Sequence, residues 1–269
     1  MSGHFARLDA LEFPEFRPGT VWLVGAGPGA PGLLSLLAYH ALGTADVIVY
    51  DALVSNQLLA LAHPAAEQIY AGKRGGKPSE KQADISLRLV DLARQGRRVL
   101  RLKGGDPFMF GRGAEECAAL LAHGIAFRVV PGITAGIGGL AYAGIPATSR
   151  DTNQAVIFLT GHDETGGIPA AVNWAAVANA APVIVMYMAV KHLPSIAEKL
   201  IAGGRPPDDP LAIVIEASLP TQRIVTGALG RVADVIDQLA APAIVVLGPQ
   251  TGIGRLDWYL DQLRENHLG

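Results

Sequence analysis

The stretch VWLVGAGPGAPGLLS (residues 21–35) has the pattern of a short buried strand that runs into a glycine-rich turn and then into a helix. Gly25, Gly27 and Ala30 match the spacing G-x-G-x-x-A, which is typical of dinucleotide-binding turns. Pro28 and Pro31 lie inside the turn, however, and each removes a backbone N–H that a pyrophosphate would bind. The stretch therefore predicts the first strand–turn–helix unit of an α/β fold, and by itself leaves the ligand open.

The chain around this stretch alternates short β-branched runs with helical patterns. It has 269 residues, half of them hydrophobic, which is enough to bury a sizeable core. Short loops between alternating strands and helices predict a mostly parallel sheet covered on both faces, with ligands at the carboxyl ends of the strands. The expected strands are 21–24, 46–50, 67–71, 98–103 and 126–130, and the expected helices are 33–42, 57–61, 79–94 and 114–123.

The pattern changes after Ile145-Pro146, where glycine and proline turns replace several of the helices. We expect an N-terminal α/β domain over 18–146 and a second α/β domain with a mixed sheet over 147–269, with the ligand cleft between them. The expected strands of the second domain are 155–160, 183–188, 211–216, 223–228 and 243–247, with helices near 193–201 and 232–239.

Composition argues against several classes of partner. The net charge of −2 gives no sign of binding to nucleic acid or to a membrane surface. Residues 73–112 carry eleven basic and four acidic side chains, which suits either solvated helix faces or a small polyanionic substrate. The single cysteine, Cys117, and the spacing of the histidines predict neither a disulfide nor a metal site.

The sequence also predicts neither an export signal nor a membrane-spanning segment. The first sixteen residues lack the basic and apolar regions of an export signal. The charge-free runs 129–149 and 166–190 are interrupted by glycine, proline or asparagine, so neither predicts a membrane-spanning helix. We expect a cytoplasmic protein.

Three glycine-rich turns each follow an expected strand: GAGPG (25–29), KGGDP (103–107) and PGITAGIGG (131–139). Glycine lets the backbone approach a ligand closely and adopt positive φ. One such turn is weak support for a ligand site, because tight strand–helix turns need glycine in any case. Three at the same edge of one sheet predict a pocket walled by bare backbone.

Seven segments of the chain together form a recognisable set: VWLVGAGPG, VIVYDALVS, AGKRGGKPS, RLKGGDPFMFGRGAEE, VVPGITAGIGGLAYAGIPATSRD, FLTGHD and VIVMYMAV. With these segments, the sequence resembles the C-methyltransferases of the tetrapyrrole methylase family from about Val21 to about Gly248. Residues 71–79 and 135–146 are most similar to stand-alone members of the cobalamin pathway, without the module that precedes the domain in sirohaem synthases.

The resemblance implies the transfer of two methyl groups from S-adenosyl-L-methionine to C2 and C7 of uroporphyrinogen III, giving precorrin-2 for cobalamin or sirohaem. It implies no metal, S-adenosyl-L-homocysteine as the second product, and a homodimer. The chemistry fits the residues, because this cofactor has no phosphate and its sulfonium methyl is already activated, so that positioning dominates. A ring proton must then be lost to a base, and the many carboxylates of the substrate suit guanidinium groups.

The resemblance also implies roles for particular residues. Asp51 corresponds to a suggested proton acceptor and Lys73 to a suggested proton donor. Arg112 is a second candidate for deprotonation or substrate binding, and Arg74 and Arg150 are candidates for substrate binding. The implied cofactor contacts are Pro28, Gly104, Gly105, Asp106, Met109, Thr134, Ala135, Met188, Ala212, Gly227 and Ala243.

Simpler roles remain open for several of these side chains. Asp51 could cap the next helix, Met188 could be core, and Arg112 could sit on the surface at a helix start. Lys73 and Arg74 could be exposed loop residues.

Two positions depart from the family pattern, which commonly has aspartate at Ala30 and histidine at Ser149. A methyltransferase for a related precorrin and a non-catalytic tetrapyrrole-binding protein therefore stay as alternatives. A NAD(P)-dependent dehydrogenase that uses Gly25, Gly27 and Asp51 is the alternative from another class.

Overall fold

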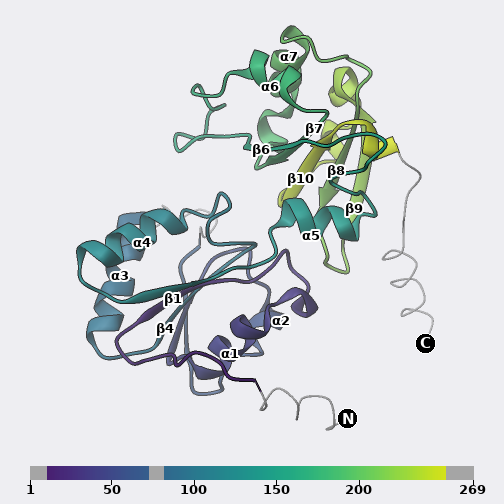
Figure 1. The fold of residues 1–269 in the computed structure, drawn as a ribbon. Helices are drawn as coiled ribbons and strands as arrows, with labels where there is room; N and C mark the ends of the chain where they lie inside the picture. The colour runs from purple at the N-terminus through teal and green to yellow at the C-terminus, as the bar shows by residue number, and fades with distance from the viewer. Residues whose placement is uncertain (1–10, 73–81, 253–269) are drawn as a thin grey trace, which may run out of the picture. The chain divides into compact units, whose positions relative to one another are not determined.

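A computed structural model describes residues 11–72 and 82–252, which form two compact α/β units (Figure 1). The first unit contains the described residues up to Gly132 except for 28–30. The second contains the described residues from Ile133 onward together with Pro28–Ala30.

The first unit is built on a five-stranded sheet in the order β3-β2-β4-β1-β5. All of its neighbouring strands run parallel. The mostly parallel sheet expected from the alternating pattern is therefore confirmed. Its strands are β1 (Val21–Gly25), β2 (Val47–Tyr50), β3 (Glu67–Tyr70), β4 (Val99–Lys103) and β5 (Phe127–Val130).

Helices cover both faces of this sheet (Figure 1). Trp22, Val24 and Leu100 are buried with residues of α1 (Leu36–Thr44) and α2 (Asn56–Leu59). Val21, Leu23 and Val99 point the other way and are buried with α3 (Gln82–Arg94) and α4 (Gly113–Ala122). This alternation follows from the two-residue period of a strand. With both faces covered, the carboxyl ends of the strands remain available for function.

The second unit has a five-stranded sheet in the order β6-β7-β10-β8-β9. Strands β6 and β7 are parallel, and the other neighbours are antiparallel, so the expected mixed sheet is confirmed. Its strands are β6 (Val156–Thr160), β7 (Val183–Tyr187), β8 (Pro210–Ile215), β9 (Arg223–Ala228) and β10 (Ala243–Leu247).

Helices α6 (Trp174–Ala180) and α7 (Leu193–Ala202) pack on one face of this sheet and form the core with β7, β8 and β10. The prediction of a helix near 232–239 is wrong, because this region contains the short 3-10 segments η4 (Leu229–Asp234) and η5 (Ile236–Gln238). The remaining 3-10 segments are η2 (Pro31–Leu33), η3 (Val190–His192) and η6 (Pro249–Gly252).

Helix α5 (Ala135–Tyr142) corrects the expectation that 131–139 is a single glycine-rich turn. It contacts β7 and β10, so the compact units divide at Gly132 and the helix belongs with the second. A Cβ at Gly136 would lie 2.3 Å from the Tyr187 hydroxyl, and one at Gly139 would lie 2.7 Å from the Ala217 Cβ. Glycine is used here for close packing, and that tertiary requirement overrides its low helix propensity.

Within residues 11–72 and 82–252, no helix has the length and apolar character needed to cross a bilayer.

Candidate active site

The turns that follow β1, β4 and β5 lie against one another at the carboxyl end of the first sheet, where these strands are neighbours. The backbones of Gly27 and Gly105 pair, with N–H to O distances of 3.1 and 2.7 Å. A Cβ at Gly132 would come within 2.2 Å of the Gly105 carbonyl oxygen and 2.7 Å of the Gly25 Cα. Bare backbone is therefore required where the three turns meet.

Asp106 joins two of these turns. Its Oδ1 accepts a hydrogen bond from Phe108 N–H at 2.8 Å, and its Oδ2 accepts one from Gly132 N–H at 3.0 Å. The residue is partly exposed, so its carboxylate is held in place while remaining accessible. Gly104 and Gly105 precede it in the same turn.

Asp51 follows β2 at the same end of the sheet. Its carboxylate accepts hydrogen bonds from Leu53 N–H at 3.0 Å and from Gly104 N–H at 3.2 Å. Helix α2 is capped instead by Ser55, whose hydroxyl accepts from Leu58 N–H. The alternative that Asp51 caps this helix is wrong, and the structure brings Asp51 to the turn that holds Asp106.

A buried group of charges lies beneath this edge, and the sequence analysis missed it. Arg101 and Lys103 of β4 both reach Glu116 of α4, with nitrogen–oxygen distances of 2.9 Å from Arg101 Nε and 3.1 Å from Lys103 Nζ. Their side chains are at most 4% exposed. Gln82 also donates to Glu116 at 2.9 Å. The sequence did contain a signal for this group: two basic residues at i and i+2 of an otherwise apolar strand lie on the same face and need a common acidic partner when that face is buried.

The pKa values of this group reflect competition between burial and charge. Burial raises the pKa of the Glu116 carboxyl, but Arg101 and Lys103 together outweigh burial and hold that pKa below its ordinary value. Burial lowers the pKa of the Lys103 ammonium, and Arg101 lowers it further, while Glu116 and Asp51 oppose the shift. The predicted base Asp51 thus lies within the electrostatic reach of a buried lysine.

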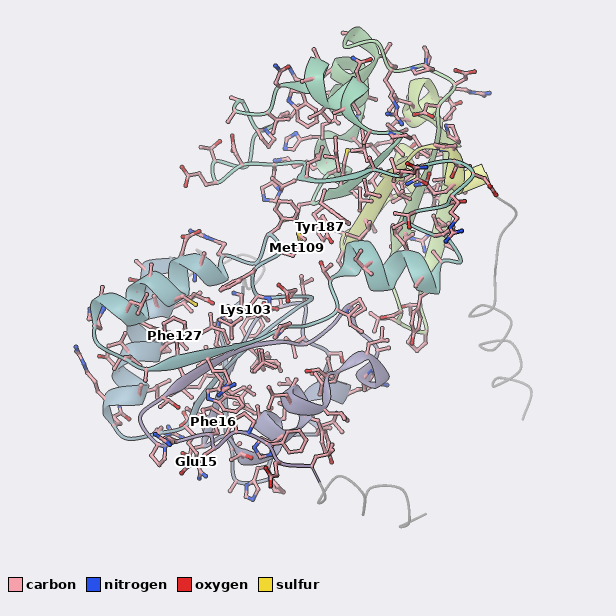
Figure 2. The ribbon with its side chains drawn as sticks, viewed as in Figure 1. Glu15, Phe16, Lys103, Met109, Phe127 and Tyr187 are labelled. Atoms are coloured by element: carbon pink, nitrogen blue, oxygen red, sulfur yellow. The ribbon has the colours of Figure 1, made fainter. Side chains whose placement is uncertain are left out.

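The loop after Asp106 contains Met109, Phe110 and Arg112, with Met109 and Lys103 labelled in Figure 2. Phe110 and Arg112 have positive φ angles of 53° and 59°, a strained conformation that often marks functional loops. The exposed Arg112 guanidinium forms two bonds to Glu115, the shorter at 2.6 Å. Its hydrogen bond to Glu115 lowers the pKa of that carboxyl. Arg112 does lie on the surface at the start of α4.

In the second unit, the predicted contacts Thr134 and Met188 flank one side chain. The Thr134 hydroxyl lies 2.7 Å from the hydroxyl of Tyr187, and Met188 directly follows that tyrosine. Met188 is 43% exposed and has a φ of 53°, so the alternative that it is a core residue is wrong. Ala135 begins α5 beside Thr134.

The remaining predicted contacts of the second unit do not gather at one place. Ala243 pairs with Ile215 in the sheet, next to the pairing of Ile244 with Tyr187. Gly227 pairs with Leu211 at the opposite end of β8, and Ala212 is fully buried within the sheet. Ala243 therefore shares an edge with Met188, while Ala212 and Gly227 lie further along the strands.

The segment Glu216–Ser218, which the sequence analysis missed, lies at the same edge as Met188. Glu216 and Ser218 have positive φ angles of 50° and 65°. The Ser218 hydroxyl accepts a hydrogen bond from Ala30 N–H at 3.0 Å, and a Cβ on Gly138 would lie 3.2 Å from the Cγ of Pro28. The strand pattern offered no sign of this segment, because its contacts are to residues far away in sequence.

Arg150 is exposed in a turn closed by pairing of Ser149 with Asn153. The Asn153 side chain holds this turn by accepting from Ser149 N–H and donating to the Ala147 carbonyl. Lys73 and Arg74 lie outside the described residues.

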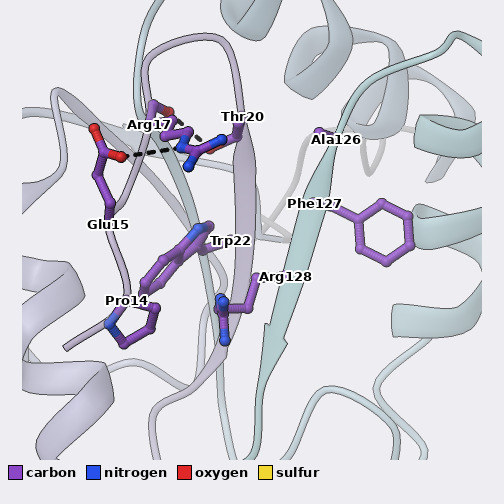
Figure 3. A pocket seen from close by; sticks show the side chains of 8 residues that line it. All are labelled: Pro14, Glu15, Arg17, Thr20, Trp22, Ala126, Phe127 and Arg128. Carbon is purple, nitrogen blue, oxygen red and sulfur yellow. Dashed lines mark hydrogen bonds and ion pairs between the residues drawn. The ribbon is translucent and has the colours of Figure 1, made fainter. Parts of the chain in front are cut away.

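A hollow of about 380 Å³ opens at the amino end of β1 and β5, away from the glycine turns (Figure 3). The Arg128 guanidinium lies 5.2 Å from the Trp22 ring centre, while Phe127 points to the other side of the strand. Arg17 at its rim is paired with Glu15 at 3.0 Å. Ligands of parallel sheets bind at the opposite edge, so this hollow is not the candidate site. Its lining residues are Pro14, Glu15, Arg17, Thr20, Trp22, Ala126, Phe127 and Arg128.

The chemistry of the glycine-turn edge fits S-adenosyl-L-methionine. Asp51 and Asp106 place two carboxylates among the turns, which would repel a pyrophosphate but suit a sulfonium cation and ribose hydroxyls. Pro28 and Pro31 withhold N–H groups from the first turn. These features argue against a dinucleotide.

Comparison with known proteins shows which class of protein has this fold and site. The family model described as Tetrapyrrole (Corrin/Porphyrin) Methylases matches residues 20–233, and the chain belongs to this family. The resemblance found in the sequence is therefore confirmed.

The chain is also similar to individual proteins of known activity. The chain is 60% identical over 257 residues to a uroporphyrinogen-III C-methyltransferase of Sinorhizobium sp., covering 94% of this chain and 90% of that protein. It is 44% identical to a siroheme synthase of Neisseria meningitidis serogroup C, covering 95% of this chain but only 53% of that protein. The crystal structure of a Thermus thermophilus uroporphyrin-III C-methyltransferase complexed with S-adenosyl homocysteine superposes with a TM-score of 0.77 at 40% identity, covering 87% of this chain and 99% of that one.

Proposed function

We propose that this protein transfers methyl groups from S-adenosyl-L-methionine to uroporphyrinogen III. The observation that carries the proposal is the meeting of three glycine turns with the Asp51 and Asp106 carboxylates at one sheet edge. The high identity to the Sinorhizobium C-methyltransferase over nearly its full length supports the choice of substrate.

The cofactor supplies an activated methyl group, so the protein has to position a pyrrole carbon and remove a proton. Asp106 holds the ribose and methionine portion with Gly104, Gly105 and Met109. Asp51 accepts the ring proton in this proposal, and its carboxylate is held beside Gly104, in the turn that contains Asp106. The further proposed cofactor contacts are Pro28, Thr134, Ala135, Met188, Ala212, Gly227 and Ala243.

Basic side chains bind the carboxylates of the substrate in this proposal. Arg112 is exposed and oriented by Glu115, and Arg150 is exposed in its turn. Guanidinium groups bind carboxylates through two parallel hydrogen bonds. Arg74 completes the set, and Lys73 acts as proton donor.

The finer assignments are part of the same proposal. Two methyl groups are added, at C2 and C7, giving precorrin-2. Precorrin-2 serves cobalamin or sirohaem synthesis, and both kinds of enzyme are found among the relatives of the family. The protein acts as a cytoplasmic homodimer.

The decisive experiment combines the protein with S-adenosyl-L-methionine and anaerobically prepared uroporphyrinogen III. We expect a product that has gained two methyl groups by mass spectrometry and oxidises to a red-fluorescent chlorin. Omitting the cofactor is the control. A substrate that is bound but never methylated would indicate a non-catalytic tetrapyrrole-binding protein and end the proposal.

A titration separates the proposed cofactor from that of a dehydrogenase. We expect micromolar binding of S-adenosyl-L-homocysteine by calorimetry and no binding of NAD(P) at the same concentrations. The reverse result would favour a dehydrogenase. Analytical ultracentrifugation of the full chain tests the homodimer.

A further inference from the structure

Tyr187 places its hydroxyl between the start of α5 and the turn that precedes it. The hydroxyl lies 2.7 Å from the Thr134 hydroxyl and accepts a hydrogen bond from Gly136 N–H at 2.9 Å. Tyr187 is 8% exposed, and it is labelled in Figure 2. The bond to Gly136 is buried and the bond to Thr134 is partly buried, so losing the tyrosine hydroxyl leaves a buried N–H without its partner, which is costly.

This arrangement replaces an ordinary helix cap. Thr134 stands at the N-cap of α5, and a threonine there usually accepts a hydrogen bond from an N–H of the first turn. Here the Tyr187 hydroxyl takes the Gly136 N–H, and the Thr134 hydroxyl bonds to the tyrosine instead. The fit is tight, because a Cβ at Gly136 would lie 2.3 Å from the tyrosine oxygen. The helix start is thus adjusted to a side chain more than fifty residues away in the sequence.

Tyr187 also fixes the segment that contains Met188. It is the last residue of β7, and its carbonyl oxygen accepts a hydrogen bond from Gly161 N–H at 2.7 Å. Met188 then turns to a positive φ of 53° and leaves its side chain 43% exposed. Both proposed cofactor contacts are consequently linked to Tyr187. Thr134 is linked to it by a hydrogen bond to the hydroxyl, and Met188 is the next residue along the backbone.

We propose that Tyr187 is a positioning residue for the cofactor, which sets the spacing between the Thr134 turn and Met188 through its hydroxyl. The proposal rests on the proposed cofactor contacts of Thr134 and Met188. The aromatic ring supplies stiffness, because a tyrosine has only two side-chain torsions to restrain, and its hydroxyl supplies direction. A phenylalanine would fill the same space and leave the Gly136 N–H and the Thr134 hydroxyl to find other partners.

The test is a double-mutant cycle with Tyr187→Phe and Thr134→Val in the full chain, with S-adenosyl-L-homocysteine as the probe. Each single change should weaken binding about tenfold, since each removes the hydrogen bond between the Thr134 and Tyr187 hydroxyls. The double variant should bind no more weakly than the weaker single variant, because both changes remove the same contact. Thr134→Ser keeps the hydroxyl and should bind more tightly than Thr134→Val.

The readouts separate positioning from simple stabilisation. Thermal unfolding of each variant without ligand reports on stability, and calorimetry of the folded protein reports on affinity. If Tyr187→Phe lowers the melting temperature but binds the probe like the unmodified protein, the hydroxyl is only structural and the proposal is overturned. Strictly additive losses in the double variant would overturn it as well.

The outcome also separates this inference from the proposed function. A Thr134→Val variant with unchanged affinity would overturn the proposed contact of Thr134 and this inference with it. Failure of the unmodified protein to methylate uroporphyrinogen III, with the coupling between Tyr187 and Thr134 intact, would overturn only the proposed substrate. If Tyr187→Phe does not fold, the pair Thr134→Val and Thr134→Ser decides: equal affinities would contradict a role for the hydroxyl bond.

Discussion

The Oδ2 atom of Asp106 accepts a hydrogen bond from the backbone N–H of Gly132 at 3.0 Å, and this contact joins the turn after β4 to the turn after β5. Its other oxygen is bonded to Phe108 N–H at 2.8 Å. The carboxylate therefore orients its own loop and a neighbouring one before any ligand binds. A ligand group that meets Asp106 finds it already oriented, which lowers the cost of binding.

Asp106→Asn should weaken binding of S-adenosyl-L-homocysteine about tenfold. An amide has only one accepting oxygen, so one of the two backbone N–H groups would face an NH₂ donor. Calorimetry measures the affinity, and Asp91→Asn on the exposed side of α3 is the matched control. Equal affinities in the two variants would contradict a role for Asp106 in holding the cofactor.

Asp51→Asn should separate binding from chemistry. The amide oxygen can still accept from Gly104 N–H, so affinity for S-adenosyl-L-homocysteine should stay within about twofold of the unmodified protein. Loss of the base should lower the turnover number by about 100-fold or more. Rates of methyl transfer under saturating cofactor measure this, and an unchanged rate would remove Asp51 from the proton transfer.

Gly132→Ala should lower the free energy of unfolding by about 1–3 kcal/mol, because its Cβ would lie 2.2 Å from the Gly105 carbonyl oxygen. Gly43→Ala is the opposite case: it lies in α1, and a Cβ there would meet no described atom within 4 Å. That change should raise stability by up to about 1 kcal/mol. Urea unfolding measures both, and equal effects would show that the contact of the turns tolerates a side chain.

Glu116→Gln should lower the free energy of unfolding far more than Lys103→Met does. Removing the carboxylate leaves two buried cations unpaired, at a cost of about 3–5 kcal/mol. Removing Lys103 leaves Arg101 paired with Glu116, so the loss should be smaller. Chemical denaturation at neutral pH compares the two, and equal losses would contradict this view of the group.

The same carboxylate gives a pH dependence with a definite sign. The pKa of Glu116 lies below its ordinary value of 4.5, so its contribution to stability is complete above pH 4.5 and is lost as pH falls through the folded-state pKa. Unfolding measured below pH 4.5 should therefore show a steeper loss of stability for the unmodified protein than for Glu116→Gln. Parallel curves would exclude Glu116 as a contributor to acid unfolding.

Local patterns predicted most of the strands and the class of each sheet. Buried strands such as Val21–Gly25 contain a continuous apolar run, and helices such as α1 begin at a serine whose hydroxyl accepts a hydrogen bond from an N–H of the first turn. Such signals are contained in a few adjacent residues. Helix α5 was not predicted, because its glycines disfavour a helix locally. The close approach of Tyr187 and Ala217, which requires glycine at two positions, is visible only in the tertiary structure.

The sequence by itself determined the alternation of strands and helices, the three glycine turns and the family, because each depends on short motifs. Only the tertiary structure decided which residues around those turns touch: Asp106 with Gly132, Asp51 with Gly104, and Tyr187 with Thr134. The buried ion pairs of Arg101 and Lys103 with Glu116 were likewise decided by the tertiary structure. Strand order brings together segments that are distant in the chain, and hydrogen bonds and ion pairs act over a few ångströms in space whatever the separation in sequence.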